Sequence, residues 1–309
     1  MLRLQEALDI FLAAMEGIVS PKTIAFYAKR LPSLITFLGD IPAEEIDIVD
    51  LRAWRGFLSR RPLQYTHRKP RSVKDNHLSP NTVHQYVRCV RRLFRWLFLE
   101  GLIASNPAQR LELPALPNPR PRGIPLADLE KLYVSAETAR DRAIVLFLGD
   151  TAARVGGVAG LQLKDLNLSL GQAIVHEKGR GGNGKTRPVF FNERTRQALE
   201  LYLAERPDIP GCESVFVREK CNRYKPGALT TDGIYQVLKR LARKAGVKAN
   251  FNPHSFRHGS LRGMLEAGMP LPDVSQIAGH SSVKVTGDIY GVVSDMVLSQ
   301  RHQKYSWLK

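Results

Sequence analysis

Residues 252–258 read Asn-Pro-His-Ser-Phe-Arg-His, and this stretch carries the strongest structural and chemical signal in the chain. Asparagine is a favoured N-cap and proline suits the first helical position, so a helix is predicted to begin at Pro253. His254 then lies in the first turn, where free backbone N–H groups favour an anion. Arg257 follows three residues later, on the same face of the helix. The stretch therefore predicts a helix start that binds an anion such as a phosphate group.

Two short segments further along the chain extend this candidate site. Residues 278–282 read Ala-Gly-His-Ser-Ser, and residues 288–290 read Asp-Ile-Tyr. His280 adds a second imidazole, and Tyr290 can attack a phosphate and form a covalent link. Each residue also has an ordinary interpretation, as a surface histidine, a turn after a helix or a core tyrosine. Their order and spacing together favour a catalytic site.

The composition of the chain indicates globular domains and a polyanionic partner. The chain has 309 residues, more than one compact core usually needs, and 43% of them are hydrophobic. The formal net charge of +17 points to nucleic acid, with an anionic membrane surface as the alternative. Residues 50–96 hold twelve Lys and Arg against two Asp, which is typical of a surface that contacts a phosphate backbone.

Two negative observations bear on where the protein acts. No apolar run reaches the length of a membrane span, and the N-terminus lacks a signal-peptide pattern. Cys89, Cys212 and Cys221 are far apart, without paired metal-ligand spacing, and are predicted to be reduced thiols. We therefore expect a cytoplasmic protein, and the net charge of +17 predicts that it is nucleoid-associated.

Helical periodicity predicts a small, basic, all-helical domain over residues 1–111. Helices are predicted at residues 2–16, 20–38, 47–61 and 79–100. The sequence Ser-Pro-x-Thr at 20–23 and again at 79–82 is typical of a capped helix start. Pro32 should bend or divide the second helix. Residues 62–78 are polar and basic without any period, and are predicted to form a loop.

A proline-rich stretch separates this domain from the rest of the chain. Six prolines lie in residues 106–125, and such a run favours an extended, semi-rigid connector over a helix. We place the linker at residues 112–124 and a second domain, which includes a C-terminal tail, at residues 125–309.

The second domain is predicted to be mainly α-helical with one β-hairpin. Helices are predicted at residues 126–136, 139–150, 155–161, 192–206, 231–245, 253–267 and 271–278. Short strands at 172–177 and 187–191 flank the Gly-rich segment 178–185, whose four glycines allow a close approach of the backbone to DNA. The cations of this hairpin and of the first domain are predicted to bind DNA. They are Arg68, Lys69, Arg71, Lys74, Arg88, Arg91, Arg92, Arg95, Arg180, Lys185 and Arg187.

Five short motifs, in this order, make the chain resemble the tyrosine recombinase (phage-type integrase) family, as a Xer-like two-domain member. They are Thr151-Ala152-Ala153-Arg154, Lys178-Gly179 at the hairpin, His254-Ser255-Phe256-Arg257-His258, Gly279-His280-Ser281 and Ile289-Tyr290. The resemblance covers about residues 126–295. It implies a helical core-binding domain followed by a mixed catalytic domain.

The resemblance also implies a function. A member of this family acts as a site-specific recombinase, which cleaves and rejoins DNA strands through a 3′-phosphotyrosine intermediate without ATP, metal ion or cofactor. It serves DNA integration, excision or dimer resolution. The implied partner is a double-stranded DNA recombination site, bound by a tetramer on two duplexes. A tail such as the one after Tyr290 often packs on a neighbouring subunit, the alternative being its own domain.

The implied catalytic residues are Arg154, Lys178, His254, Arg257, His280 and Tyr290. The two arginines would neutralise charge developing on the phosphate oxygens, to which His280 would donate a hydrogen bond. His254 would act as acid, base or orienting group near Tyr290, the nucleophile. Lys178 would protonate the departing 5′-oxygen.

The sequence departs from the family pattern in three places. Many members carry an acidic residue three positions after the first catalytic arginine, where this chain has Gly157, and Asp165 is one candidate to replace it. The hairpin tip is long, so Lys185 competes with Lys178 for the role of acid. The interval from the second histidine to the tyrosine is about one residue longer than in many relatives.

The sequence alone is compatible with two other functions. A type IB topoisomerase shares this chemistry but relaxes supercoils as a monomer, and a catalytically silent DNA-binding accessory protein could use the same fold. The small N-terminal domain, the second histidine and the tail favour recombination. The presence of all six site residues argues against a silent protein.

Overall fold

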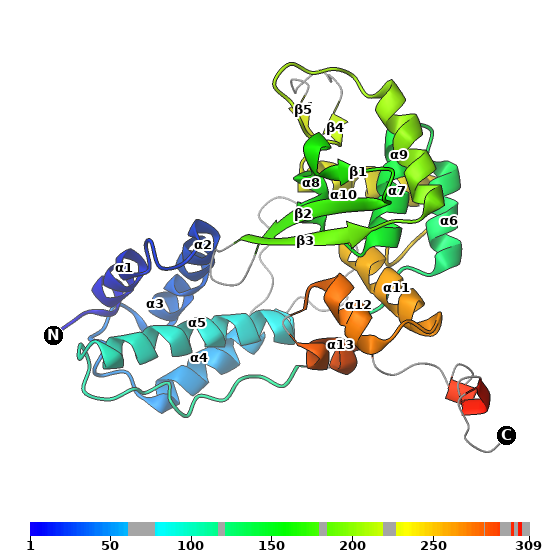
Figure 1. Cartoon of the computed structure of the whole chain (residues 1–309). Helices are drawn as coiled ribbons and strands as arrows, with labels where there is room; N and C mark the ends of the chain where they lie inside the picture. The colour runs from blue at the N-terminus through cyan, green and yellow to red at the C-terminus, as the bar shows by residue number, and fades with distance from the viewer. Residues whose placement is uncertain are drawn as a thin grey trace. The chain divides into compact units, whose positions relative to one another are not determined.

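The computed structural model describes residues 1–60, 78–116, 121–178, 184–218, 227–280, 282–290, 298–299 and 302–304. The chain divides into two compact units, Met1–Asn118 and Pro119–Lys309 (Figure 1). This division falls inside the range 112–124 that was predicted as the linker.

The named elements in the described part of the first unit are all α-helices. They are α1 (Leu4–Ala14), α2 (Pro21–Arg30), α3 (Pro32–Leu38), α4 (Ile48–Arg60) and α5 (Pro80–Leu99). The predicted division at Pro32 is confirmed, since α2 ends at Arg30 and α3 begins at Pro32. Both predicted caps are confirmed as well: Ser20 Oγ accepts from the Thr23 amide at 3.3 Å, and Ser79 Oγ from the Thr82 amide at 3.2 Å. The predicted loop 62–78 lies almost entirely outside the described residues.

The core of the first unit is organised around α5. One face of this helix is buried, through Val83, Val87, Val90, Leu93, Phe94 and Leu97. Trp54 of α4 and Phe11 of α1 belong to the same core. Each such side chain contributes about 1.5–3 kcal/mol by leaving water. No helix in the part of the chain that the structure describes is long and apolar enough to cross a membrane.

The second unit is mixed, with helices around a small sheet (Figure 1). Its helices in the described residues are α6 (Leu126–Ser135), α7 (Ala139–Thr151), α8 (Val155–Ala159), α9 (Glu193–Glu205), α10 (Thr231–Lys244), α11 (Pro253–Glu266), α12 (Leu271–Ala278) and α13 (Val283–Tyr290). Helix α7 is the most deeply buried, with its residues 143–148 all in the core. The predicted fold class, mainly α with a small β component, is confirmed.

The predicted hairpin is confirmed and is longer than expected. Strands β2 (Gln172–Lys178) and β3 (Gly184–Phe190) pair antiparallel, with Glu177 opposite Lys185. Strand β1 (Leu166–Asn167) completes the sheet in the order β1-β2-β3, and β4 (Val217–Arg218) pairs with β5 (Gly227–Ala228). The three two-residue strands were not predicted, because two residues are too few to show an alternating pattern.

Candidate active site

The predicted helix start at Pro253 is confirmed, and it brings Arg257 into the interior of the second unit. Asn252 Oδ1 accepts a hydrogen bond from the Ser255 amide at 3.1 Å, which caps α11. The Arg257 side chain is buried and donates to the carbonyl oxygens of Ala152 and Ala278. Arg257 thereby ties α11 to the residues that follow α7 and to the end of α12.

The other predicted arginine, Arg154, follows a distorted turn after α7. Ala152 has a φ of 52°, in the left-handed region that an alanine adopts only at a cost of about 1–2 kcal/mol. Its carbonyl oxygen accepts hydrogen bonds from both Arg257 and Arg187. Arg154 is the N-cap residue of α8, and 37% of its side chain is exposed. It is therefore open to an incoming anion.

His280 lies beside Arg257 and is held by a threonine of α13. Its Nδ1 is 2.7 Å from Thr286 Oγ1, and its Nε2 is 3.3 Å from Arg257 Nη2. A guanidinium can only donate, so Nε2 accepts and Nδ1 carries the proton. Burial lowers the pKa of His280 to about 4, with Arg257 and the other site arginines acting in the same direction. The imidazole is therefore neutral at neutral pH.

Tyr290 is the last residue of α13, and its hydroxyl is hydrogen-bonded to Nδ1 of His258. The rings of Tyr290 and His258 have centroids 5.6 Å apart. Burial raises the pKa of the Tyr290 phenol, although Arg257 opposes the shift. The helix that carries this tyrosine was not predicted from the sequence.

His258 therefore takes the place near the tyrosine that was predicted for His254. His254 is exposed in the first turn of α11, with its ring centroid 6.5 Å from that of His258. Residues at positions i and i+4 share a helix face, so the spacing of the two histidines was the signal that could have identified His258. Burial lowers the pKa of His258, as do His254 and Arg257.

The carboxylate of the site comes from Glu177, on strand β2. It accepts hydrogen bonds from the Arg154 amide at 2.9 Å, from the Arg154 guanidinium and from Arg187 Nη2 at 3.0 Å. Burial by itself raises the pKa of Glu177, but the hydrogen bonds from Arg187 and Arg154 more than offset it, and the pKa lies below its usual value. The prediction that Asp165 supplies this carboxylate is wrong, because Asp165 Oδ2 lies 3.3 Å from His176 Nε2 instead.

The placement of Arg187 corrects its prediction as a DNA contact. Its residue surface is only 5% exposed, because the side chain binds Glu177 and the Ile277 carbonyl oxygen. A side chain so enclosed does not lie on a surface that could contact DNA.

The two lysines of the hairpin are described to different extents. Lys178 ends β2 and pairs with Gly184, but its side chain lies outside what the structure describes. Lys185 is exposed, and its Nζ donates to the Gly279 carbonyl oxygen at 3.0 Å, next to His280 in the chain. The role of Lys178 as the acid, with Lys185 as the alternative, stays a prediction.

Five of the predicted DNA contacts lie outside the described residues. They are Arg68, Lys69, Arg71, Lys74 and Arg180.

The charges of this site favour an anion. Three guanidinium groups, those of Arg154, Arg187 and Arg257, surround the single carboxylate of Glu177. Burial lowers the pKa of Arg257 to about 10, helped by Arg154 and Arg187, so it stays charged at neutral pH. Two positive charges remain uncompensated among these four side chains, enough to neutralise the single negative charge of a phosphodiester and the further charge that develops in its transition state.

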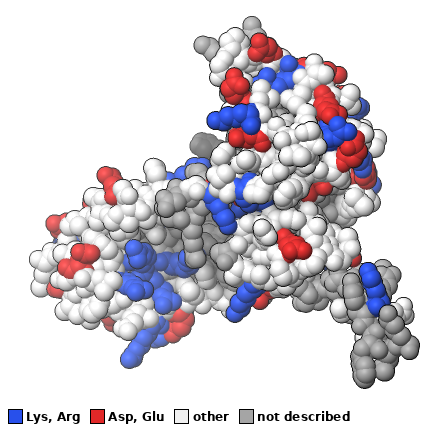
Figure 2. All heavy atoms as spheres, in the orientation of Figure 1, with Lys and Arg blue, Asp and Glu red and all other residues white. Residues whose placement is uncertain are grey.

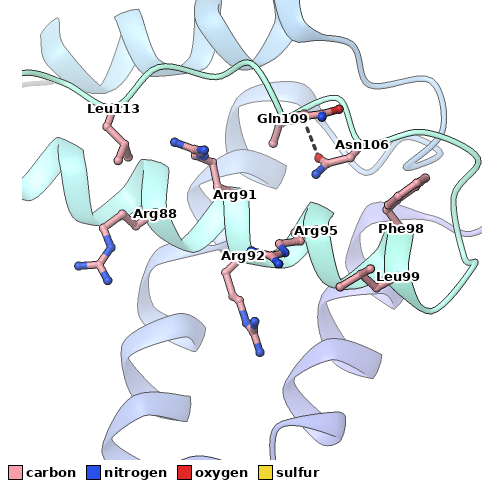
Figure 3. A pocket seen from close by; sticks show the side chains of 10 residues that line it. Arg88, Arg91, Arg92, Arg95, Phe98, Leu99, Asn106, Gln109 and Leu113 are labelled. Atoms are coloured by element: carbon pink, nitrogen blue, oxygen red, sulfur yellow. Dashed lines mark hydrogen bonds between the residues drawn. The ribbon is translucent and has the colours of Figure 1, made fainter. Parts of the chain in front are cut away.

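A second cationic feature lies on the first unit, along α5. Arg88, Arg91, Arg92 and Arg95 occupy positions i, i+3, i+4 and i+7, which share one helix face. They line a hollow together with Phe98, Leu99, Asn106, Gln109 and Leu113 (Figure 3). Figure 2 shows Lys and Arg gathered over this part of the unit. No carboxylate pairs with the four arginines among the described residues, so their charges are available to a polyanion.

Known proteins resemble this chain over most of its length. Tyrosine recombinase XerD of Listeria monocytogenes is 30% identical over 235 residues, which cover 74% of this chain and 76% of that protein. Tyrosine recombinase XerC of Oceanobacillus iheyensis is 28% identical over 301 residues, or 94% of this chain and 92% of that protein.

Solved structures share the fold. XerA recombinase superposes with a TM-score of 0.52 at 25% identity, over 97% of this chain and 98% of that one. The Tn1549 transposon integrase, solved in complex with a circular intermediate DNA, superposes with a TM-score of 0.74 at 17% identity, over 99% and 100% of the two chains. Residues 124–296 match the phage integrase family. The chain belongs to this family and is a Xer-like tyrosine recombinase, an enzyme that cleaves and rejoins DNA strands.

Proposed function

We propose that Tyr290 cleaves one DNA strand by attacking a phosphate held by Arg154, Arg257 and His280. One observation carries this proposal: the Tyr290 hydroxyl is hydrogen-bonded to an imidazole at the edge of a cluster of three arginines. A phenol near neutral pH is a weak nucleophile, and such a base is what activates it.

The proton of the phenol passes to His258 in this proposal. Burial raises the pKa of Tyr290, so the phenol is protonated at neutral pH. Burial lowers the pKa of His258, so its imidazole is neutral and able to accept a proton. His254, one turn earlier on α11, would assist from the solvent side. General base catalysis of this kind typically contributes about 100- to 10,000-fold.

The bond changes in this reaction balance without a cofactor. The Tyr290 oxygen forms a bond to phosphorus while the bond from phosphorus to the 5′-oxygen breaks, and Lys178 supplies the proton that the 5′-oxygen takes up. The products are a 3′-phosphotyrosine and a free 5′-hydroxyl. Attack by a 5′-hydroxyl reverses the step and rejoins the strand.

A bound phosphate would have to replace one contact within the site. Nε2 of His280 accepts a hydrogen bond from Arg257. A phosphate oxygen that takes this guanidinium N–H would release Nε2, and the negative charge of the phosphate would favour protonation of His280. His280 could then donate to the phosphate, as predicted for it.

The arginines of α5 would bind the phosphate backbone of a double-stranded recombination site. The four side chains span about 10 Å along the helix axis, which suits contacts with several phosphates. Lys185 would add a cation at the catalytic unit. We further propose that four copies act on two duplexes, in integration, excision or dimer resolution, and that the protein is associated with the nucleoid. The tail that would join neighbouring copies lies mostly outside the described residues.

The test begins with DNA sequences that the purified full chain selects from a random pool. A nicked duplex that carries the selected sequence should trap the protein as a covalent complex, seen as a slower band on a denaturing gel. Tyr290→Phe should abolish trapping and leave DNA affinity within about threefold. Tyr235→Phe is the matched control, since Tyr235 is 38% exposed on α10.

The outcomes separate the possible functions. Covalent trapping by Tyr290→Phe would refute the proposal. Strand transfer between two duplexes that carry the selected sequence would support recombination. Relaxation of a supercoiled plasmid that lacks this sequence would indicate a topoisomerase instead.

A further inference from the structure

Glu177 is a buried carboxylate that belongs to the site but cannot reach DNA, since only 1% of its side chain is exposed. We propose that Glu177 positions Arg154 for the phosphate, and that Gly157 is required as glycine because the Glu177 side chain occupies the space beside it. This inference rests on the proposed function of Arg154 as a phosphate ligand.

The hydrogen bonds of Glu177 fix Arg154 at two points. One carboxylate oxygen accepts from the Arg154 backbone amide at 2.9 Å, and the other accepts from the Arg154 guanidinium. The buried Glu177 carboxylate thus fixes both the backbone position of Arg154 and the orientation of its side chain. The exposed part of the guanidinium remains available to an anion.

Arg187 holds Glu177 in place from the other side. Its Nη2 and Nε lie 3.0 Å and 3.4 Å from the two carboxylate oxygens, and its Nη1 donates to the Ile277 carbonyl oxygen. Strand β3 and helix α12 therefore both fix the orientation of the carboxylate. A buried charge with this many donors is a rigid support for its neighbours.

Two glycines leave the room that this arrangement needs. A Cβ on Gly157 would lie 3.2 Å from Glu177 Cγ and 3.1 Å from Val175 Cβ. A Cβ on Gly279 would lie 2.7 Å from Arg187 Cδ, and the φ of +64° at Gly279 also favours glycine. The carboxylate and the residue three positions after Arg154 therefore compete for the same space.

This arrangement explains the missing acidic residue in the sequence. In many members of the family an acidic residue stands three positions after the first catalytic arginine, where this chain has Gly157 on α8. The structure supplies the carboxylate from strand β2 instead, and the glycine at 157 is what admits it. A carboxylate from either position would meet the same arginine, which suggests that the two positions are interchangeable as a pair.

The first test compares two neighbouring glycines on α8. Gly157→Ala should lower the single-turnover cleavage rate of the nicked duplex about tenfold, because the added methyl group displaces Glu177 and with it Arg154. Gly156→Ala is the matched control, since nothing lies within 4 Å of its Cβ, and should leave the rate unchanged. Equal rates for the two variants would overturn the inference.

The second test asks whether Glu177 acts through Arg154. Glu177→Gln should lower the cleavage rate about 100-fold while DNA affinity stays within about threefold. In the Arg154→Ala background the same substitution should have almost no further effect, because the group it positions is gone. A purely structural role would instead lower the rate by the same factor in both backgrounds, and that result would refute the inference.

Moving the carboxylate from position 177 to position 157 provides a separate test if Glu177→Gln does not fold. The double variant Gly157→Glu with Glu177→Gly should cleave at least tenfold faster than Glu177→Gly alone. Cleavage no faster than that of the single variant would count against the inference. If Arg154→Ala itself cleaved at the wild-type rate, the proposed function of Arg154 would be refuted. If instead Arg154→Ala lost activity and Glu177→Gln did not, only the positioning role of Glu177 would be refuted.

Discussion

The arginines of α5 and those of the catalytic unit differ in how much of their hydrogen-bonding capacity the protein uses. Arg88, Arg92 and Arg95 are exposed and have no acidic partner among the described residues. Arg187 and Arg257 are buried, and backbone carbonyl oxygens or Glu177 accept from them. The same side chain is thus exposed on one unit and held in a fixed geometry on the other.

This difference follows from what each group has to do. Attraction to a polyanion depends on charge and exposure, so a flexible side chain suffices. Stabilising a transition state requires donors that are already oriented, and the buried guanidinium groups of the catalytic unit, held among acceptors, would meet this requirement under the proposed function. The exposed arginines should therefore govern affinity, and the buried ones the rate.

The largest expected effect that separates the two groups is at Arg257. Arg257→Lys keeps a positive charge but cannot donate to the Ala152 and Ala278 carbonyl oxygens in the same geometry. We expect the single-turnover cleavage rate to fall about 100- to 1,000-fold, with little change in DNA affinity. Arg262→Lys, on the exposed side of α11 with Glu266 as its partner, should cleave normally. If DNA affinity fell by the same factor as the cleavage rate, the prediction that buried arginines govern the rate and not the affinity would be wrong.

A smaller effect is expected on the surface of α5. The double variant Arg88→Gln and Arg92→Gln should weaken DNA binding and reduce the slope of log affinity against log salt by about 1.8, or about 0.9 for each lost phosphate contact. The cleavage rate at saturating DNA should not change. Arg3→Gln is the control, because Asp40 already neutralises that arginine at 2.9 Å. An unchanged salt slope would show that this face does not contact the phosphate backbone.

The smallest effect concerns pH and the partly buried imidazoles of His258 and His280. The pKa of His280 falls from 6.5 to about 4 on folding, chiefly through burial. Below pH 6.5 the unfolded chain takes up a proton that the folded protein does not, so stability should fall as the pH drops from 6.5 towards 4. The shift at His258 has the same direction. Thermal unfolding between pH 7 and pH 5 should show this slope, and His280→Gln should reduce it. A variant that kept the full slope would show that His280 is not responsible.

The elements predicted best from the sequence were those with a local signal. The caps at Ser20 and Ser79 and the helix start at Pro253 depend on residues within one turn, and all three are present. The hairpin was visible as two short runs around a Gly-rich segment. Helix α13 was missed although it carries the tyrosine, because it is only eight residues long and its glycine at 287 lowers the helix propensity of the segment.

The site residues show the same division. Arg154, Arg257, His280 and Tyr290 were named from their motifs, and the structure brings them to one side of the catalytic unit, where Arg257 contacts His280 directly. The sequence did not reveal that His258 contacts the tyrosine or that Glu177 orients the arginine, since both depend on side chains from separate elements.

The sequence by itself determined the helix starts, the proline-rich boundary and the set of chemical groups, because each is encoded within a few neighbouring residues. Only the tertiary structure decided which histidine meets the phenol, which carboxylate meets Arg154, and that Arg187 is enclosed. These outcomes depend on how much space neighbouring elements leave, as at Gly157 and Gly279, where an added Cβ would lie 3.2 Å from Glu177 Cγ and 2.7 Å from Arg187 Cδ. Such space is a property of the packed fold and has no local signature in the chain.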